Sequence, residues 1–288
     1  MAKPTITDKH IIQGPVAHGG NMSDIRAILG LIKEARRESS LYTSDKNAIA
    51  TVFETIPDKY SYSSILVKLT IIDSLYSTQM GRRYYGLDEL AGALHELHSC
   101  CDLAENFRLL ASGRMTKDGF AIKNGKSNLF EERYGIGKDG TDKGTAVSLI
   151  TKYAYFETGG NFPIYDSIAR EMYPKIWTYC GFDRKDCPNH KELLELETFI
   201  SAINKLKSLV AIDGLTYDDI DRLLWTTGKI VRGNLSLVLT REEYDYMSDN
   251  NLLGEDGFSI RDADIGLLPF LDGKPLLKSL FKLAKEFA

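Results

Sequence analysis

The sequence predicts a mostly α-helical protein, and two observations favour this class. Apolar residues recur at helical spacing through most of the 288 residues, whereas strand-like stretches are few and the best of them covers 235–239. A chain of this length with 43% hydrophobic residues is long enough to bury a substantial core. We therefore expect one large helical domain, or two that pack closely together.

The N-terminal region, residues 1–60, is predicted to form an arm followed by helices. Its first 20 residues are polar and contain glycine, which is typical of an arm or a loosely attached strand. Ser23 and Asp24 can cap a first helix whose apolar residues begin at Ile25, and Ser44 and Asp45 can start a second.

Residues 61–233 are expected to form the helical core, and residues 234–288 a small C-terminal cap. A buried helix is predicted at 63–80, another starts at Asp88, and 112–128 is rich in Gly, Lys, Asp and Asn, as loops or short hairpins are. Helix signals resume at Leu129. The later predictions are an amphipathic helix at 191–210, a helix capped by Thr216 and a final helix at 276–287.

Composition excludes several classes of protein. No apolar run approaches the roughly 20 residues of a membrane span, and the N-terminus lacks the apolar region of a signal peptide. Four scattered cysteines favour a reduced, cytoplasmic setting, and the spacing of Cys180, Cys187 and His190 matches no usual zinc pattern. We expect no metal and no cofactor, because no Walker, Rossmann or His-Glu-x-x-His pattern occurs. The net charge of −4 argues against coating nucleic acid by bulk attraction, although a local basic face is compatible with it.

Residues 144–170 carry the most informative pattern. An apolar helix predicted at 144–156 contains Lys152 and runs into a break at Gly159 and Gly160. A Phe-Pro-Ile-Tyr-Asp segment then places the carboxylate of Asp166 at the start of the next helix, within reach of a basic group. A lysine and a carboxylate are thus expected to meet where two helices join.

This arrangement resembles the helix-hairpin-helix DNA glycosylases, in particular bacterial proteins with an 8-oxoguanine DNA glycosylase-like fold. In that family a lysine attacks the sugar C1′, and an aspartate that follows a Pro-Val or Pro-Ile stretch assists. The stretches 66–79 and 220–229 also resemble helices of the bacterial proteins. The resemblance implies a helix-hairpin-helix glycosylase-like helical fold over 61–233, with DNA as the partner. It also implies removal of a damaged or modified base, in DNA repair or phage defence.

The resemblance offers two candidates for the nucleophile, Lys152 and Lys143, and the spacing to Asp166 does not decide between them because an ungapped count ends on Val147. Asp166 would stabilise an oxocarbenium-like sugar or deprotonate the attacking amine or water. Each residue also has a structural interpretation: Lys152 as a salt-bridge partner of Asp166 or a snorkelling lysine, and Asp166 as a helix cap.

Contacts to DNA are predicted at two places. The Gly135-Ile-Gly137 hairpin would offer backbone N–H groups to a phosphate, together with Lys138 and Lys143, unless it is an ordinary turn. Arg82 and Arg83 would lie on the same side of the protein. Tyr165 and Tyr84 are the candidates for stacking on a flipped base, although most aromatic residues at helical spacing belong to the core.

Two other functions remain open at this point. The same fold can serve as a non-catalytic module that binds nucleic acid or a protein, with Lys152 and Asp166 forming a structural ion pair. The third interpretation is an enzyme that acts on another nucleotide-like glycoside. Binding to abasic-site DNA without cleavage would favour the module.

Overall fold

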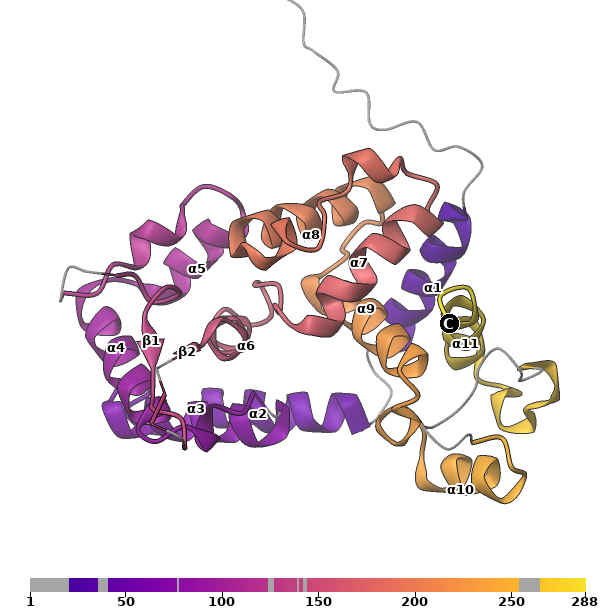
Figure 1. Ribbon diagram of the computed structural model, residues 1–288, viewed down its shortest axis with the longest axis horizontal. Coiled ribbons are helices and arrows are strands. Elements are labelled where there is room, and N and C mark those ends of the chain that lie inside the picture. Colours follow the sequence, from indigo (N-terminus) through magenta and orange to yellow (C-terminus); the bar gives the residue numbers. More distant parts are fainter. Residues whose placement is uncertain are drawn as a thin grey trace, which may run out of the picture.

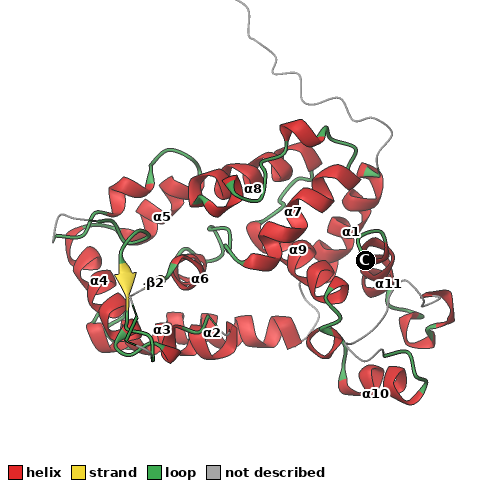
Figure 2. Cartoon of the chain, in the orientation of Figure 1, coloured by secondary structure: helices red, strands yellow, loops and turns green. Residues whose placement is uncertain are grey.

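The computed structural model describes residues 21–35, 41–76, 78–123, 127–138, 140–141, 144–253 and 265–288. In these residues the chain is mostly α-helical, as predicted, with a single two-stranded sheet (Figures 1 and 2). The α-helices are α1 (Met22–Glu34), α2 (Leu41–Thr55), α3 (Tyr62–Tyr76), α4 (Gly86–Cys100), α5 (Leu103–Ala111), α6 (Val147–Glu157), α7 (Ser167–Tyr179), α8 (Leu196–Val210), α9 (Tyr217–Val231), α10 (Arg241–Asp249) and α11 (Pro275–Lys285). The two strands, β1 (Arg133–Tyr134) and β2 (Gly144–Thr145), pair antiparallel.

The helices form two groups that lie side by side (Figure 1). In the first group α3 packs on α2, α4 and α6, and the β1–β2 hairpin packs on α4. In the second group α9 packs on α7, α1 and α11. The predicted N-terminal region therefore supplies one helix to each group. Helix α5 contacts α6 and so belongs to the first group, whereas α8 contacts α1 and α7 and belongs to the second. The groups meet where Asn204 of α8 donates to the carbonyl of Ala111 at the end of α5, 2.7 Å away, and where α2 contacts α9 through Lys46.

Helix α6 lies in the middle of the molecule, where Figure 1 shows it almost end-on. All side chains from Leu149 to Phe156 are buried, and the helix packs on α2, α3 and α5. A helix that is apolar on all sides is stable only inside a core. Because Lys152 belongs to this buried run, its ammonium group is carried into the interior.

Close packing of α7 on α9 fixes the start of α7. Gly228 of α9 has no side chain at the contact, and a Cβ atom there would lie 2.3 Å from Cγ2 of Ile168. Asp166 caps α7, as predicted, and Thr216 caps α9 in a capping box with Asp219. Both caps are formed by residues close in sequence, which is why the sequence predicts them.

Five local predictions are wrong. The helix predicted at 63–80 ends at Tyr76, and Met80 begins a separate 3₁₀ turn. Residues 235–239 contain a 3₁₀ turn instead of a strand. The helix predicted at 144–156 begins only at Val147, because Gly144 and Thr145 pair with β1. No helix begins at Leu129, since the Asn128 side chain accepts from the N–H groups of Phe130 and Glu131 and forms a turn. The helix predicted from residue 191 starts at Leu196, after a separate 3₁₀ turn. The predicted arm at 1–20 lies outside the described residues.

None of the described helices combines the length and the apolar character that a membrane crossing requires.

Candidate functional site

Lys152 is buried in the middle of α6, with only 3% of its surface exposed. Its Nζ donates a hydrogen bond to Oγ of Ser148, 2.7 Å away and one turn earlier in the helix. The ammonium group also lies over the ring of Tyr76, 5.5 Å from the ring centre. The ion pair with Asp166, which is the structural alternative for Lys152, is not formed, and no ion pair joins Lys152 to another carboxylate in the described residues.

Burial lowers the pKa of Lys152 below its usual range, because an ammonium group loses its hydration inside the protein. The negative charges of Asp166, Asp221 and Asp73 oppose this shift but do not cancel it. A larger fraction of Lys152 is therefore a neutral amine at a given pH than for a lysine at the surface. The hydrogen bond to Ser148 Oγ engages one N–H of this group.

Asp166 occupies the position that the sequence predicts. It is the N-cap of α7, it is half-buried, and its Oδ1 accepts from the N–H of Ala169 at 2.7 Å. Its negative charge acts to raise the pKa of Lys229, of Tyr76 and of Lys152, although burial outweighs this effect at both lysines. Asp166 is thus a helix cap whose charge also acts on several titratable groups of the site.

A second charged cluster, which the sequence does not predict, joins α2, α6 and α9. Nζ of Lys46 lies 2.5 Å from Oδ1 of Asp218 and 3.0 Å from Oδ2 of Asp221, and the Tyr155 hydroxyl donates to Asp218 at 2.9 Å. Burial alone would raise the pKa of Asp218, but Lys46 and the Tyr155 hydroxyl outweigh it and hold the pKa low. The only sequence signal is that Asp218 and Asp221 share one face of a predicted helix. Their partner is far away in the chain.

A pocket of about 440 Å³ opens beside this cluster, between α2 and the C-terminal end of α6. Aromatic residues and charged side chains of both signs line it, including Phe53, Tyr60, Tyr155, Glu157 and Lys59.

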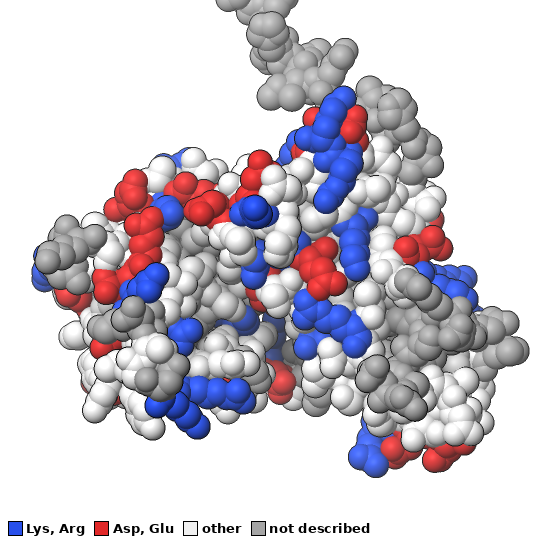
Figure 3. All heavy atoms as spheres, in the orientation of Figure 1, with Lys and Arg blue, Asp and Glu red and all other residues white. Residues whose placement is uncertain are grey.

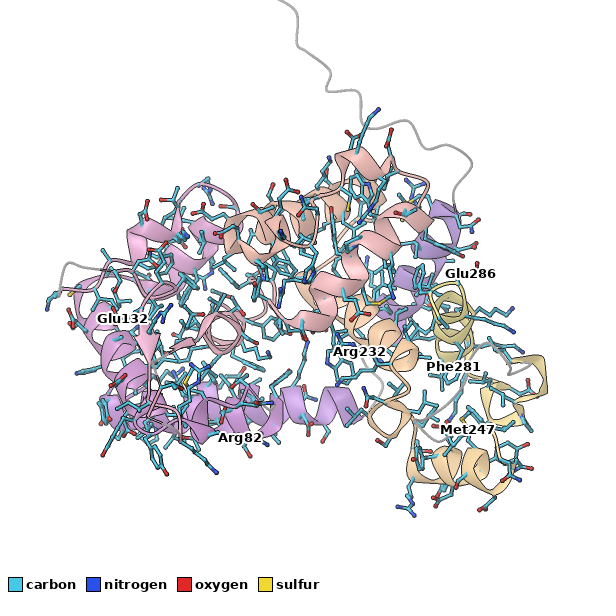
Figure 4. The ribbon with its side chains drawn as sticks, viewed as in Figure 1. Arg82, Glu132, Arg232, Met247, Phe281 and Glu286 are labelled. Atoms are coloured by element: carbon cyan, nitrogen blue, oxygen red, sulfur yellow. The ribbon has the colours of Figure 1, made fainter. Side chains whose placement is uncertain are left out.

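The predicted DNA contacts fall into two kinds. Arg82 and Lys138 are exposed, and Figure 4 places Arg82 at the lower left edge of the molecule. Figure 3 shows Lys and Arg side chains gathered there and a second such group over α7 and α9. Arg83 instead lies under the hairpin: its guanidinium group touches Gly144, and its Nη1 is buried without a hydrogen-bond partner in the described residues.

The backbone N–H groups of the hairpin are used inside the protein. Gly135 donates to Oε2 of Glu89 at 2.9 Å, Ile136 to the carbonyl of Tyr84 at 2.9 Å, and Gly137 to the carbonyl of Thr141 at 3.1 Å. In this conformation they are not available to a phosphate. Lys143, the alternative nucleophile, lies outside the described residues.

The two tyrosines predicted for the base pocket lie in different surroundings. Tyr165 is 8% exposed, and its hydroxyl donates to the carbonyl of Leu194 at 2.9 Å. Tyr84 is 59% exposed on the surface of the first helix group. No three side chains of the types that ligate metals come together in the part of the chain that the structure describes.

No protein-family model matches this chain, and neither a curated protein nor a solved structure matches it. The fold and the site define it only as a mostly α-helical protein whose central helix holds a buried lysine that contacts a hydroxyl and, among the described residues, no carboxylate.

Proposed function

We propose that this protein is a DNA glycosylase-like enzyme that removes a damaged or modified base from DNA, in repair or phage defence. The observation that carries the proposal is the state of Lys152: a buried amine with a lowered pKa, paired with a hydroxyl instead of a carboxylate, in the field of Asp166. An amine becomes a nucleophile near neutral pH only if it sheds its proton, and desolvation is one of the ways in which proteins achieve this.

In the proposed reaction, the lone pair of the Lys152 amine attacks C1′ of the nucleotide. The bond from C1′ to the base breaks, and the base leaves with that electron pair. The new bond leaves a positive charge on the lysine nitrogen, which gives up a proton to solvent, and the base takes up one proton from solvent. Positive charge develops at C1′ and the ring oxygen in the transition state, and the Asp166 carboxylate stabilises it. Ser148 is half-buried, so the amine end of Lys152 lies beside a side chain that solvent partly reaches.

DNA would contact the side of the protein that carries Arg82 and Lys138. Because each neutralised phosphate releases counterions, a few exposed cations suffice to bind DNA even when the net charge is −4. The hairpin contributes a side chain, Lys138, since its backbone N–H groups are engaged elsewhere.

The test is base release from duplexes that carry a panel of damaged or modified bases, measured for the wild-type protein and for Asp166→Asn. Asparagine also caps helices well, so the variant keeps the cap on α7 but loses the charge. We expect base release to slow by about 100-fold or more while DNA affinity and thermal stability stay close to wild type. An unchanged rate in Asp166→Asn would show that Asp166 takes no part in the mechanism. If the wild-type protein releases no base from any duplex or single strand, the proposal that it is a glycosylase is refuted.

The second candidate function is a non-catalytic DNA-binding module, and the 3% exposure of Lys152 favours it, because a nucleophile must be reached by its substrate. This module would bind abasic-site DNA and leave it intact. Tight binding without cleavage or base release would therefore select the module.

A further inference from the structure

The two most exposed large apolar or aromatic side chains in the described residues are neighbours in the chain. Tyr84 is 59% exposed and Tyr85 is 67% exposed. They lie in the turn between α3 and α4, and Ile136 of the hairpin, 39% exposed, pairs with Tyr84. We call Arg82, Tyr84, Tyr85, Ile136 and Lys138 the tyrosine surface.

The backbone of the tyrosine surface is held rigidly. The N–H and C=O groups of Tyr84 both bond to Ile136, each at 2.9 Å, and the carbonyl of Tyr85 accepts from the N–H of Glu89 at 2.9 Å. Tyr85 adopts a φ of 63°, which is unfavourable for an aromatic residue and persists only where the surroundings impose it. Gly135 allows the hairpin to press on the turn, since a Cβ atom there would lie 2.8 Å from Cα of Gly86.

The charges around the two rings fit a nucleic acid. Arg82 and Lys138 are exposed, and one lies on each of the two segments that the Tyr84–Ile136 pairing joins. Aromatic faces beside cations are what proteins use to bind unpaired strands, because the cations contact phosphates and every base offers a flat face for stacking. Tyrosine and arginine are common in protein interfaces as well, but lysine is depleted there, so Lys138 is the residue that favours a nucleic acid.

The turn is also connected to the site around Lys152. The carboxylate of Asp73 accepts from the N–H groups of Met80 at 2.8 Å and Gly81 at 2.9 Å, and so fixes the start of the turn. The same carboxylate is one of the charges that act on Lys152. The turn that carries Tyr84 and Tyr85 is thus anchored on α3 by a carboxylate that also acts on the amine.

We propose that Tyr84 and Tyr85 form a stacking platform for unpaired bases of a DNA strand whose phosphates lie on Arg82 and Lys138. This inference rests on the proposed function, because it takes DNA as the partner. Rigid aromatic side chains lose little conformational freedom when a base stacks on them, so the platform gives affinity without sequence preference.

The experiment uses the full chain and a duplex that carries a single unpaired 2-aminopurine, whose fluorescence falls when an aromatic ring stacks on it. The test variant is Tyr84→Thr with Tyr85→Asn, because threonine suits the extended pairing with Ile136 and asparagine tolerates a positive φ. We expect affinity to fall about 10-fold or more and the quenching to be lost. Tyr84→Phe with Tyr85→Phe keeps both rings and should keep both properties.

Leu237→Ala is the matched control, since Leu237 is 40% exposed outside this surface, and it should bind like wild type. Wild-type affinity and quenching in the Thr and Asn variant, with its helical content intact, would overturn the platform and leave the glycosylase proposal standing. If the two phenylalanine replacements abolish binding, the hydroxyl groups and not the rings carry it, which also overturns the platform. If the wild-type protein binds no DNA at all, the proposed function fails first and the platform falls with it.

Discussion

At the scale of single residues, Lys152 is the least expected side chain of the core. A buried ammonium group usually has a carboxylate partner, because desolvation of an unpaired charge is costly. Lys152 has a hydroxyl partner and an aromatic ring instead, and its pKa is lowered by burial. Structural lysines elsewhere in the chain differ: Lys68 pairs with Glu157 and Lys46 with Asp218 and Asp221.

Tyr76 gives a prediction at the same scale. Its hydroxyl is buried and has no hydrogen-bond partner in the described residues. Burial raises the pKa of this hydroxyl, and the negative charge of Asp221 raises it further. We expect the hydroxyl to bond to bound substrate. Tyr76→Phe should then leave the unfolding free energy unchanged or raise it by about 1 kcal/mol, because no bond in the free protein is lost. Base release should fall about 10-fold.

Denaturant unfolding and base-release assays on the same Tyr76→Phe preparation show whether the hydroxyl bonds to the substrate or to a group inside the fold. A loss of stability above about 1 kcal/mol would show that the hydroxyl already has a partner inside the fold. A stable variant with a wild-type rate of base release would leave Tyr76 without a role in the reaction.

The sequence predicts Lys152 and Asp166 as site residues but not the groups around them. Lys152 stands out as the charged residue of an apolar helix, and Asp166 as a capping residue after a proline. Tyr76 and the Lys46 cluster carry no local signal, because they join the site only when α3 and α2 pack on α6. Burial of Lys152 likewise depends on all the helices that cover α6.

At the scale of secondary structure, local signals decide what the sequence can predict. The caps at Asp166 and Thr216 are formed within three residues, so the sequence identifies where α7 and α9 begin. The start of α6 cannot be predicted this way, because Gly144 and Thr145 pair with a strand that stands earlier in the chain. The turn at Asn128 shows a local side chain overriding an apolar pair that indicates a helix.

Two glycines in helices give a paired prediction about packing. Gly228 of α9 faces Ile168 and Met172, and a Cβ atom would overlap Ile168. Gly92 of α4 has nothing within 4 Å of such an atom. We expect Gly228→Ala to lower the unfolding free energy by about 1–3 kcal/mol. Gly92→Ala should raise it by about 0.5–1 kcal/mol, because alanine favours helix.

Urea unfolding at one pH measures both variants. Stabilisation by Gly228→Ala would mean that α7 and α9 can separate without cost, and the start of α7 with Asp166 would then not be fixed by this contact.

His98 gives a prediction about pH. Burial lowers its pKa to about 4, although the charge of Glu157 acts in the other direction, and its Nε2 lies 2.9 Å from the Tyr153 hydroxyl. Between the ordinary pKa of about 6.5 and this value, the unfolded chain binds a proton that the folded chain does not. The unfolding free energy therefore decreases progressively as the pH falls through that window, because His98 resists protonation in the folded protein.

Unfolding free energies of the wild type and His98→Gln, measured from neutral pH down to the lowered pKa, test this prediction. Glutamine cannot titrate, yet its amide can still bond to Tyr153. The variant should lose less stability than the wild type over this range, and parallel pH curves would contradict the assignment to His98.

At the scale of the whole molecule, the proposed nucleophile lies on α6, the helix in the middle of the molecule. Helix α6, which carries Lys152, packs on α2 and α3 of the first group, and Figure 1 shows α7, whose N-cap is Asp166, on the side of α6 that faces the second group. The mostly α class follows from the sequence because helical periodicity is a property of each segment. The arrangement of the groups does not, since contacts such as that of Lys46 with Asp218 join distant parts of the chain.

The central claim is that Lys152 attacks C1′ of the nucleotide, and borohydride trapping tests it most directly, because this attack passes through a reducible imine. A duplex whose base the wild-type protein releases is incubated with borohydride and with wild type, Lys152→Gln or Lys143→Gln. We predict a covalent adduct of protein and DNA with wild type and Lys143→Gln, and none with Lys152→Gln. An adduct that persists in Lys152→Gln, or no adduct with wild type, would contradict the claim.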